Sequence, residues 1–452
     1  MIDSQTIWIK NPLSIAADDA SGGIVVREGR IIDLIESGKT PTAEAEIFDA
    51  SEHVVLPGLI NAHHHFYQTL TRSCDHGLNK GLFDWLKSLY PIWAQLEPEM
   101  LSLASKLAVA ELLLSGCTLS SDHHYLFPSG MEEAIGIQVA AGEELGIRLM
   151  ITRGSMSLGS EEGGLPPQSV VQSEEAILLD SEQAINRFHQ AGKGSMCQIA
   201  LAPCSPFSVS RDLMRSTAEL ARRHDVRLHT HLAETKDETY FCLDRFGLRP
   251  LDYLESCDWI GDDVWLAHGI DFNADEIIRL GQYGISICHC PTSNMMLGSG
   301  FCPVSELEEA GVAVGLGVDG SASNDCSNLA QEMRQAWLLG RLHSGPDSMT
   351  HSDAIRLATE GSAACLGRKE LGKIEVGARA DLSLYRLDEL RFSGAENPLA
   401  AIVQSGVSRA DRVMIEGEWR VSSGEIIGID LEQLRHQHDR AAKKLMSKYY
   451  LS

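Results

Sequence analysis

Short apolar segments rich in β-branched residues alternate with longer amphipathic segments between residues 54 and 320. A segment that is apolar on both faces is typical of a strand in a parallel sheet whose two faces are covered by helices. The amphipathic segments include 101–115, followed by Gly116 as a helix C-cap, and 211–224. The predicted strands, eight in number, are 57–61, 117–122, 147–153, 197–203, 226–231, 264–268, 285–289 and 312–319.

Eight strand–helix units in roughly 260 residues predict an α/β fold of the (β/α)₈ TIM barrel type rather than an open, doubly wound sheet. No glycine-rich phosphate loop follows the first predicted strand, which argues against a dinucleotide-binding fold. We therefore expect residues 57–368 to form one barrel.

The two ends of the chain share a different pattern, in which short strands are separated by turns. It is seen in "GGIVVREGRIIDLI" at 22–35 and again in "GKIEVGARADLSLYRL" at 372–387. We expect residues 1–56 and 369–452 to pair as one small β-sandwich beside the barrel. An amphipathic, charged helix is predicted over 431–448, near the end of the second segment.

Polar side chains gather where the predicted barrel strands end. The carboxyl ends of the strands in such a barrel meet at one mouth, and active sites are built there from side chains of separate strands. The pattern therefore predicts an active site at this mouth. The strand-end residues are His63, His65, Asp122, His123, His124, Arg153, His229, His231, Glu234, His268, His289 and Asp319.

The run "HHH" at 63–65 has the spacing of a metal site. Because side chains alternate between the faces of a strand, His63 and His65 are expected to point together and His64 to point away. Nitrogen ligands combined with a carboxylate suit Zn²⁺ with one position open for water. A lone buried histidine more often hydrogen-bonds to backbone, but two H-x-H pairs with a strand-end histidine and aspartate favour metal binding.

Composition and charge narrow the class of protein. Hydrophobic residues make up 44% of the chain and charged residues 22%, which are ordinary values for a globular protein. The net charge of −25 predicts no nucleic-acid partner, because such a surface repels phosphates. No segment is apolar for long enough to span a membrane. Eleven scattered cysteines and an N-terminus without signal-peptide features predict a cytoplasmic protein with reduced thiols.

Four motifs, "PGLINAHHH", "HTHLAE", "WLAHGI" and "GLGVDGSASND", resemble the amidohydrolase superfamily in its mononuclear zinc deaminase and chlorohydrolase branch. Two-metal members use a carboxylated lysine after the fourth strand, where this chain reads "LAPCSPFS" without lysine. The resemblance thus implies one Zn²⁺ per subunit, with Fe²⁺ as the alternative. It also implies site roles: metal ligands His63, His65, His231 and Asp319, the proton shuttle Glu234, a proton-accepting role for Asp319, and His268 beside the attacking water or the substrate.

The predicted pocket loops carry a narrower resemblance. "HHHFYQTLTR", "SSDHHYLFP", "RGSMSLG" and "LAPCSPFSVS" are similar to bacterial deaminases that act on 8-oxoguanine, and in part to triazine hydrolases. They imply a free purine or pyrimidine base as substrate: 8-oxoguanine, converted to uric acid and ammonia, with isocytosine and guanine as weaker substrates. Gln68, His124 and Arg153 are candidate substrate-binding residues, although His124 and Arg153 fit a structural role equally well.

Three alternatives stay open at this point. They are a triazine chlorohydrolase or aminohydrolase, a guanine- or cytosine-type deaminase, and a non-catalytic scaffold that keeps the fold. Retention of every implied ligand and of Glu234 argues against the scaffold. We also expect the chain to form a homo-oligomer.

Overall fold

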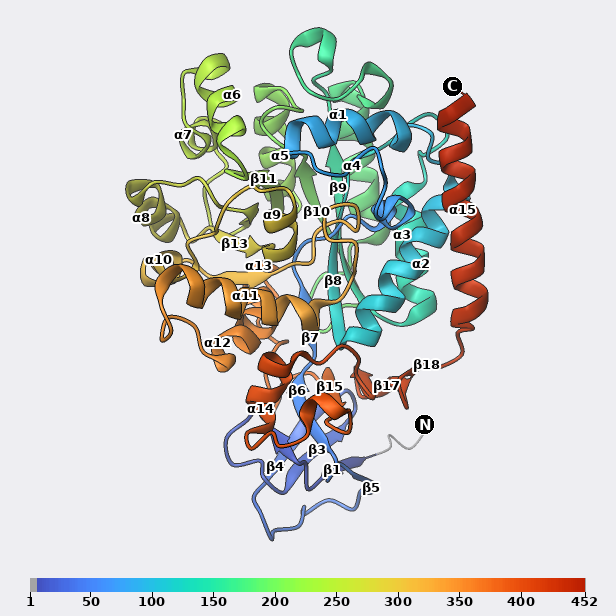
Figure 1. Ribbon diagram of the computed structural model, residues 1–452, viewed down its shortest axis with the longest axis vertical. Helices are drawn as coiled ribbons and strands as arrows, with labels where there is room; N and C mark the ends of the chain where they lie inside the picture. The colour runs from blue at the N-terminus through green and yellow to red at the C-terminus, as the bar shows by residue number, and fades with distance from the viewer. Residues whose placement is uncertain (1–5, 452) are drawn as a thin grey trace.

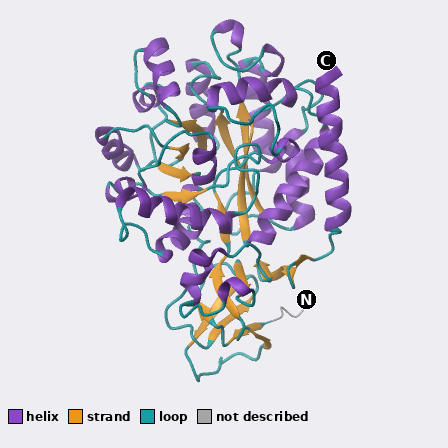
Figure 2. Cartoon of the chain, in the orientation of Figure 1, coloured by secondary structure: helices purple, strands orange, loops and turns teal. Residues whose placement is uncertain are grey.

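In the computed structural model, residues 6–451 are described, and they form a parallel barrel with a smaller β-rich unit at one end (Figures 1 and 2). The barrel sheet has the strand order β14-β13-β12-β11-β10-β9-β8-β7. The two end strands meet where Ala62 N donates to Leu316 O at 2.9 Å, so the sheet is nearly closed. Its strands are β7 (Leu59–Asn61), β8 (Cys117–His124), β9 (Arg148–Ser155), β10 (Cys197–Pro203), β11 (Leu228–Leu232), β12 (Val264–His268), β13 (Ser286–His289) and β14 (Val314–Leu316).

The predicted barrel is confirmed, and each predicted strand corresponds to one observed strand. β10 and β12 have the predicted limits, whereas β7 and β14 are shorter than predicted. The shortening has two physical reasons. Pro57 belongs to β6 of the sandwich, so β7 begins only at Leu59, and beyond Leu316 the chain leaves the sheet and forms the loop that carries Asp319.

Helices surround the barrel, and α1 lies across its upper end in Figure 1. The predicted C-cap is present, since α2 ends at Ser115 and Gly116 follows at φ +101°. The long helices of the barrel are α1 (Leu82–Trp93), α2 (Pro98–Ser115), α3 (Ala134–Leu145), α4 (Glu174–Phe188), α5 (Arg211–Arg223), α6 (Lys236–Phe246), α8 (Ala274–Tyr283) and α11 (Leu329–Ser344).

Shorter helical turns connect these elements. They are η1 (Phe66–Thr71), η2 (Ser160–Glu162), η3 (Gln168–Val170), α7 (Pro250–Glu255), α9 (Pro291–Met296), α10 (Val304–Glu309), α12 (His351–Arg356), the π-helical η4 (Leu357–Gly361), α13 (Ser362–Cys365), η5 (Leu390–Phe392), α14 (Pro398–Ala401) and the π-helical η6 (Ile402–Gly406). None of the helices within residues 6–451 is both long and apolar enough to cross a membrane.

The two chain ends form the predicted sandwich, because β6 pairs with β15 in antiparallel register. Its two sheets have the orders β4-β3-β1-β5 and β18-β17-β16-β15-β6-β2. Ile9 and Ile24 from one sheet pack with Val55 and Leu384 from the other. The strands are β1 (Ile7–Lys10), β2 (Ser14–Ile15), β3 (Gly23–Arg27), β4 (Arg30–Ile35), β5 (Glu46–Asp49), β6 (His53–Pro57), β15 (Leu382–Arg386), β16 (Arg412–Ile415), β17 (Glu418–Ser422) and β18 (Glu425–Ile426).

The exact domain limits stay a prediction, and residues 1–5 and 452 lie outside the described residues. The predicted terminal helix is present as α15 (Leu431–Leu451), which lies along α2 at the right of Figure 1. His438 on α15 contacts Thr69 on η1 through Nε2 and Oγ1, 3.0 Å apart. The last helix therefore braces the segment that follows the three histidines.

A buried ion pair ties the barrel to the sandwich. Arg148, the first residue of β9, donates from Nε and Nη2 to the two carboxylate oxygens of Asp381 at 2.7 and 3.0 Å. Nη2 also donates to Glu416. The side chains of Arg148 and Asp381 are 0% and 2% exposed, so each charge depends on the other for the hydrogen bonds that water would supply.

We predict that Asp381→Ala lowers the free energy of unfolding by about 3–5 kcal/mol, because it leaves a buried guanidinium without its main partner. Urea denaturation measures the change. The matched control is Glu133→Ala, which removes the partner of Arg187 from a pair whose side chains are 67% and 59% exposed. It should cost less than about 1 kcal/mol. Equal losses in the two variants would contradict the role of the buried pair.

Candidate active site

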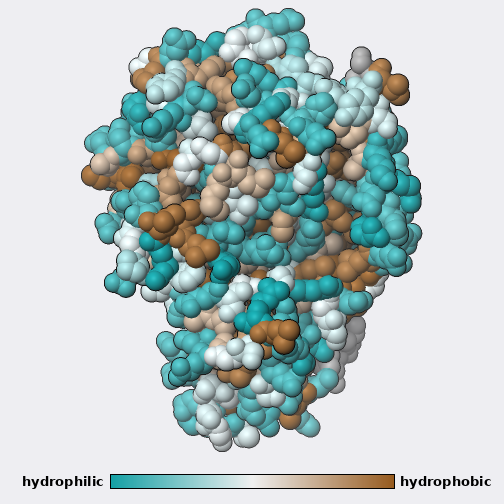
Figure 3. All heavy atoms as spheres, in the orientation of Figure 1, coloured by the Kyte–Doolittle hydropathy of each residue, from teal (hydrophilic) through white to brown (hydrophobic). Residues whose placement is uncertain are grey.

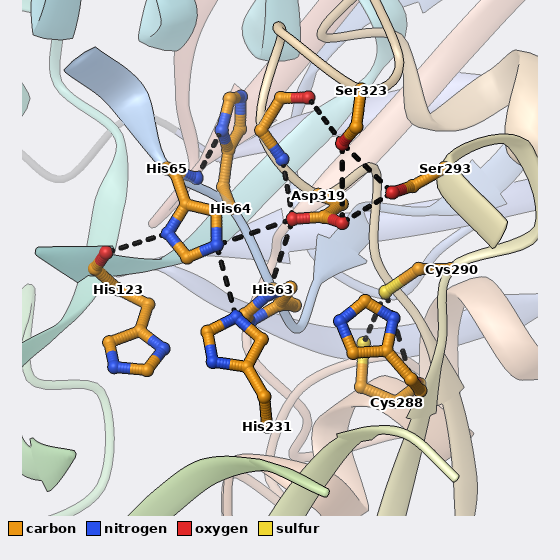
Figure 4. Close-up of polar contacts among 12 residues, drawn as sticks. His63, His64, His65, His123, His231, Cys288, Cys290, Ser293, Asp319 and Ser323 are labelled. Atoms are coloured by element: carbon orange, nitrogen blue, oxygen red, sulfur yellow. Dashed lines mark hydrogen bonds and ion pairs between the residues drawn. The ribbon is translucent and has the colours of Figure 1, made fainter. Parts of the chain in front are cut away.

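Three imidazoles and one carboxylate converge at the carboxyl ends of the barrel strands (Figure 4). Asp319 Oδ1 lies 3.3 Å from Nε2 of His63 and 3.3 Å from Nε2 of His65. His65 Nε2 lies 3.2 Å from Nε2 of His231. All four residues are buried. Segments far apart in the sequence, after β7, on β11 and after β14, thus supply one compact donor set.

The spacing of these atoms fits a tetrahedral metal ion. With metal–ligand bonds of about 2.0–2.1 Å, neighbouring ligand atoms of a tetrahedron lie about 3.3–3.4 Å apart. The observed separations of 3.2 and 3.3 Å match that value. Nε2 of His63 is buried and has no hydrogen-bond partner among the described residues, which leaves its lone pair for a metal. The donor set therefore fits a single ion.

The second ring nitrogen of each imidazole has a partner that aims Nε2 inward. Nδ1 of His65 donates to the carbonyl of His123 at 2.7 Å, and Nδ1 of His231 donates to the carbonyl of Cys204 at 2.6 Å. Burial, followed by repulsion from His63, lowers the pKa of His65 to about 3. Burial likewise holds the pKa of His231 well below its ordinary value. The rings are therefore neutral and able to bind a cation.

His63 is oriented through a second histidine. Its Nδ1 lies 2.8 Å from Nε2 of His229, and Nδ1 of His229 lies 2.9 Å from the carbonyl oxygen of Trp265. The carbonyl can only accept, so His229 donates to it and accepts from His63. In the second H-x-H pair, His231 thus belongs to the donor set, and His229 orients His63.

His64 points away from the donor set. Its Nε2 lies 2.8 Å from Ser327 Oγ, and its Nδ1 accepts from the backbone N–H of His65 at 2.7 Å. Although β7 ends at Asn61, the alternation of side chains continues through the three histidines. The structure thus brings together the outer two histidines, as the spacing predicts.

The first turn of α9 positions two other residues of the site. Ser293 Oγ donates to Asp319 Oδ2 at 2.6 Å, which turns Oδ1 toward the histidines. Nδ1 of His268 donates to Oδ1 of Asn294 at 3.0 Å, which leaves Nε2 facing the site. His268 and Asp319 have φ of +76° and +61°, values that non-glycine residues rarely adopt. Such backbone strain is typical of functional sites.

The carboxyl group of Glu234 lies beside the donor set. Its Oε2 is 3.5 Å from Nε2 of His268. Glu238 holds the segment in place by accepting from the backbone N–H groups of Ala233 and Glu234, each at 3.0 Å. Burial, reinforced by the charges of Asp319 and Glu238, raises the pKa of Glu234 well above its ordinary value. A carboxyl group in such surroundings can carry and release a proton near neutral pH.

The pKa of Asp319 is displaced in the opposite direction. Burial alone would raise it, but the interaction with His63 and with the other neighbouring imidazoles holds the pKa well below its ordinary value. The site therefore contains two carboxyl groups with opposite protonation preferences. That combination is typical of acid–base chemistry.

A cavity opens over these groups at the mouth of the barrel. Its apolar walls include Leu82, Trp85 and Leu86 of α1 together with Phe207 and Leu297. The polar lining consists of His65, Gln68, Tyr90, Tyr125, Cys204, His231, Glu234, His268, Asp319 and Ser323. A cavity that combines an apolar wall with convergent polar groups is typical of a small-molecule site.

Two of the candidate substrate-binding residues lie elsewhere. Neither Arg153 nor His124 is among the lining residues of this cavity. Arg153 Nε donates to Asp180 Oδ2 at 2.7 Å, and its guanidinium lies 3.9 Å from the ring centre of Phe127. The ring of His124 contacts those of Phe127 and Tyr67 edge-on. These contacts correspond to the structural role that the sequence left open.

His123 is a neighbour of the donor set that the sequence did not single out. Its ring stacks on that of His231 at 4.8 Å, and one of its nitrogens lies within ligand distance of the cluster. Its Nε2 donates to the carbonyl of Ala202 at 3.0 Å. Alternation along β8 places His123 and His124 on opposite sides, but it does not tell which of the two faces the donor set.

The sequence matches a known protein family and several of its members. Residues 54–420 match the model of the amidohydrolase family. The chain is 59% identical to the 8-oxoguanine deaminase of Pseudomonas aeruginosa, over 97% of this chain and 99% of that protein. It is 34% identical to the hydroxydechloroatrazine ethylaminohydrolase of a Pseudomonas species, over 94% of this chain and 91% of that protein.

Among solved structures, the zinc complex of atrazine chlorohydrolase from Arthrobacter aurescens TC1 has a similar fold. The TM-score is 0.91 at 29% identity, with 96% of this chain and 100% of that chain covered. A family match that covers most of the chain, the near-complete coverage of these relatives and the shared barrel agree with one another. The chain belongs to the amidohydrolase family.

Proposed function

We propose that the protein is a zinc-dependent hydrolase that deaminates a free aminopurine, with 8-oxoguanine as the substrate. The observation that carries the proposal is the close approach of Asp319 Oδ1 to His63 and His65, and of His65 to His231, at 3.2–3.3 Å beside a cavity lined by Glu234. The 59% identity to an 8-oxoguanine deaminase supports the choice of base. The finer assignments below belong to the same proposal.

Zinc fits the donors of this site. Three imidazole nitrogens and one carboxylate oxygen are borderline and hard ligands of the kind that zinc accepts, and they come from His63, His65, His231 and Asp319. β10 ends at Pro203 and is followed by Cys204 rather than by a lysine that could bridge a second ion. When bound, zinc lowers the pKa of a coordinated water to near neutrality and so supplies a nucleophile.

The residues around the metal position have different roles in the proton transfers. Glu234 is held protonated by burial and delivers its proton to the ring nitrogen next to the reacting carbon. Asp319 is held ionised and accepts a proton from the attacking water. His268 faces the same space through Nε2, whose lone pair can accept a hydrogen bond from the attacking water.

The proposed reaction balances with water alone. The oxygen of water forms a bond to C2 of 8-oxoguanine, and the bond from C2 to the exocyclic amino nitrogen breaks. Proton transfer to that nitrogen releases ammonia, and the ring product is uric acid. Gln68, which accepts from the backbone N–H of Ala322 at 3.3 Å, lines the cavity and offers its amide N–H groups to the base.

We also infer a cytoplasmic location and a homo-oligomeric state. The location is supported by the eleven cysteines, all of which are free thiols. The oligomer is supported by exposed apolar side chains, among them Ile278 on α8 and Leu342 on α11, which are 54% and 83% exposed. In Figure 3, hydrophobic side chains gather over this side of an otherwise largely hydrophilic face.

We predict that His63→Ala and His65→Ala each reduce bound zinc well below one ion per chain and abolish turnover, because three remaining ligands hold the ion poorly. His64→Gln is the matched control and should keep its zinc, since His64 contacts Ser327 instead. Elemental analysis of the purified variants measures the metal. Zinc loss in His123→Asn together with zinc retention in Asp319→Asn would exchange those two residues in the ligand set.

We predict that Glu234→Gln keeps one zinc per chain and comparable substrate binding, whereas kcat falls by about two to four orders of magnitude. The amide has nearly the same shape but cannot transfer a proton. Steady-state ammonia release and metal analysis on the same preparation provide the test. Turnover near that of the unmodified protein would remove Glu234 from the chemistry.

We predict that kcat/KM for ammonia release is highest with 8-oxoguanine and lower with guanine and isocytosine. A buried polar group matched to the oxidised edge is left unpaired by guanine, which discriminates strongly. A chlorotriazine assayed for chloride release tests the triazine hydrolase alternative under the same conditions. A clear preference for guanine or for the triazine would refute the substrate while leaving the metal site intact.

A further inference from the structure

Tyr90 lies in the part of α1 that covers the barrel mouth. The helix supplies Leu82, Trp85 and Leu86 to the cavity wall, and Tyr90 lies one turn further along. Its side chain is fully buried and lines the cavity. The metal donors occupy the strand ends, so α1 forms the wall across the cavity from them. The phenol is therefore placed to contact the part of a substrate that lies away from the metal.

The hydroxyl of Tyr90 has no hydrogen-bond partner among residues 6–451. Among the lining residues, all of which are described, it is the one buried side-chain polar atom without a hydrogen bond. Its neighbours are engaged: Gln68 accepts from Ala322, and Ser323 Oγ donates to Asp319 Oδ2 at 3.4 Å. An unpaired buried hydroxyl is unfavourable, so its retention on a cavity wall indicates a partner that arrives with a ligand.

The phenol is a hydrogen-bond donor at neutral pH. Burial raises the pKa of Tyr90 well above its ordinary value. The group therefore keeps its proton and suits an acceptor such as a carbonyl oxygen.

We propose that the Tyr90 hydroxyl donates a hydrogen bond to the C8 oxygen of the bound base and thereby selects 8-oxoguanine over guanine. This inference rests on the function proposed above. The proposal places C2 at the metal donors, so that C8, the ring atom furthest from C2, is directed toward the α1 wall. Guanine carries a C–H at C8, so with guanine bound the hydroxyl would stay unpaired.

Tyr90→Phe tests the proposal, because it removes one oxygen atom and keeps the ring. The value of kcat/KM for 8-oxoguanine should fall about tenfold to a hundredfold, the scale of one lost buried hydrogen bond. The value for isocytosine, which has no five-membered ring, should stay within about twofold. Binding of the product, uric acid, followed by calorimetry, should weaken by a similar factor, which gives a readout independent of turnover.

Tyr253→Phe is the matched control. Tyr253 on α7 is also fully buried with an unpartnered hydroxyl, but it does not line the cavity. This variant should leave both substrates and uric acid binding unchanged. Zinc content and thermal stability of Tyr90→Phe should match those of the unmodified protein, because no internal hydrogen bond is lost.

The outcomes separate the two proposals. If the unmodified protein releases no ammonia from 8-oxoguanine, the proposed function fails. If it does so and Tyr90→Phe matches it with 8-oxoguanine, or loses equally with isocytosine, the assignment of Tyr90 to the C8 oxygen is wrong while the proposed function stands.

Discussion

The close approach of three imidazole nitrogens and one carboxylate oxygen is the constraint on which the rest of the structure depends. Asp319 Oδ1 lies 3.3 Å from Nε2 of His63 and of His65, and Nε2 of His65 lies 3.2 Å from that of His231, with all four residues buried. Lone pairs held that close repel one another and are costly to bury unless a cation lies between them. The surrounding protein must therefore hold each group in place and leave room for an ion.

The barrel does this by using its own backbone. Nδ1 of His65 and of His231 each donates to a carbonyl oxygen at the end of a neighbouring strand, which fixes both ring and tautomer. His268 and Asp319 leave their strands through strained φ values, and α9 holds both through Ser293 and Asn294. Glu238 fixes the backbone of Glu234 in the same manner. The sandwich holds the barrel through the ion pair between Arg148 and Asp381, and α15 holds η1 through His438, so both support the site without lining it.

The sequence predicted the features that depend on short-range periodicity. Apolar runs marked β10 and β12 within their limits, and alternation of side chains separated His63 and His65 from His64. The pairing of the two chain ends was also predicted, because both carry the same strand-and-turn pattern. These features follow from residue spacing, which is visible without a structure.

Features that depend on packing between distant segments could not be predicted in the same way. Arg153 lies near the end of β9, two residues before Ser155, yet its guanidinium lies on Phe127 and pairs with Asp180 of α4. His123, and not His124, lies beside the donor set, because the rotation of β8 decides which of two adjacent histidines faces inward. Tyr90 reaches the cavity because α1 folds across the mouth.

The most direct test of the account is zinc-edge X-ray absorption of the purified protein. It should give one ion with nitrogen and oxygen ligands at about 2.0–2.2 Å. A sulfur shell at about 2.3 Å or a second metal at about 3.5–4 Å would contradict the account.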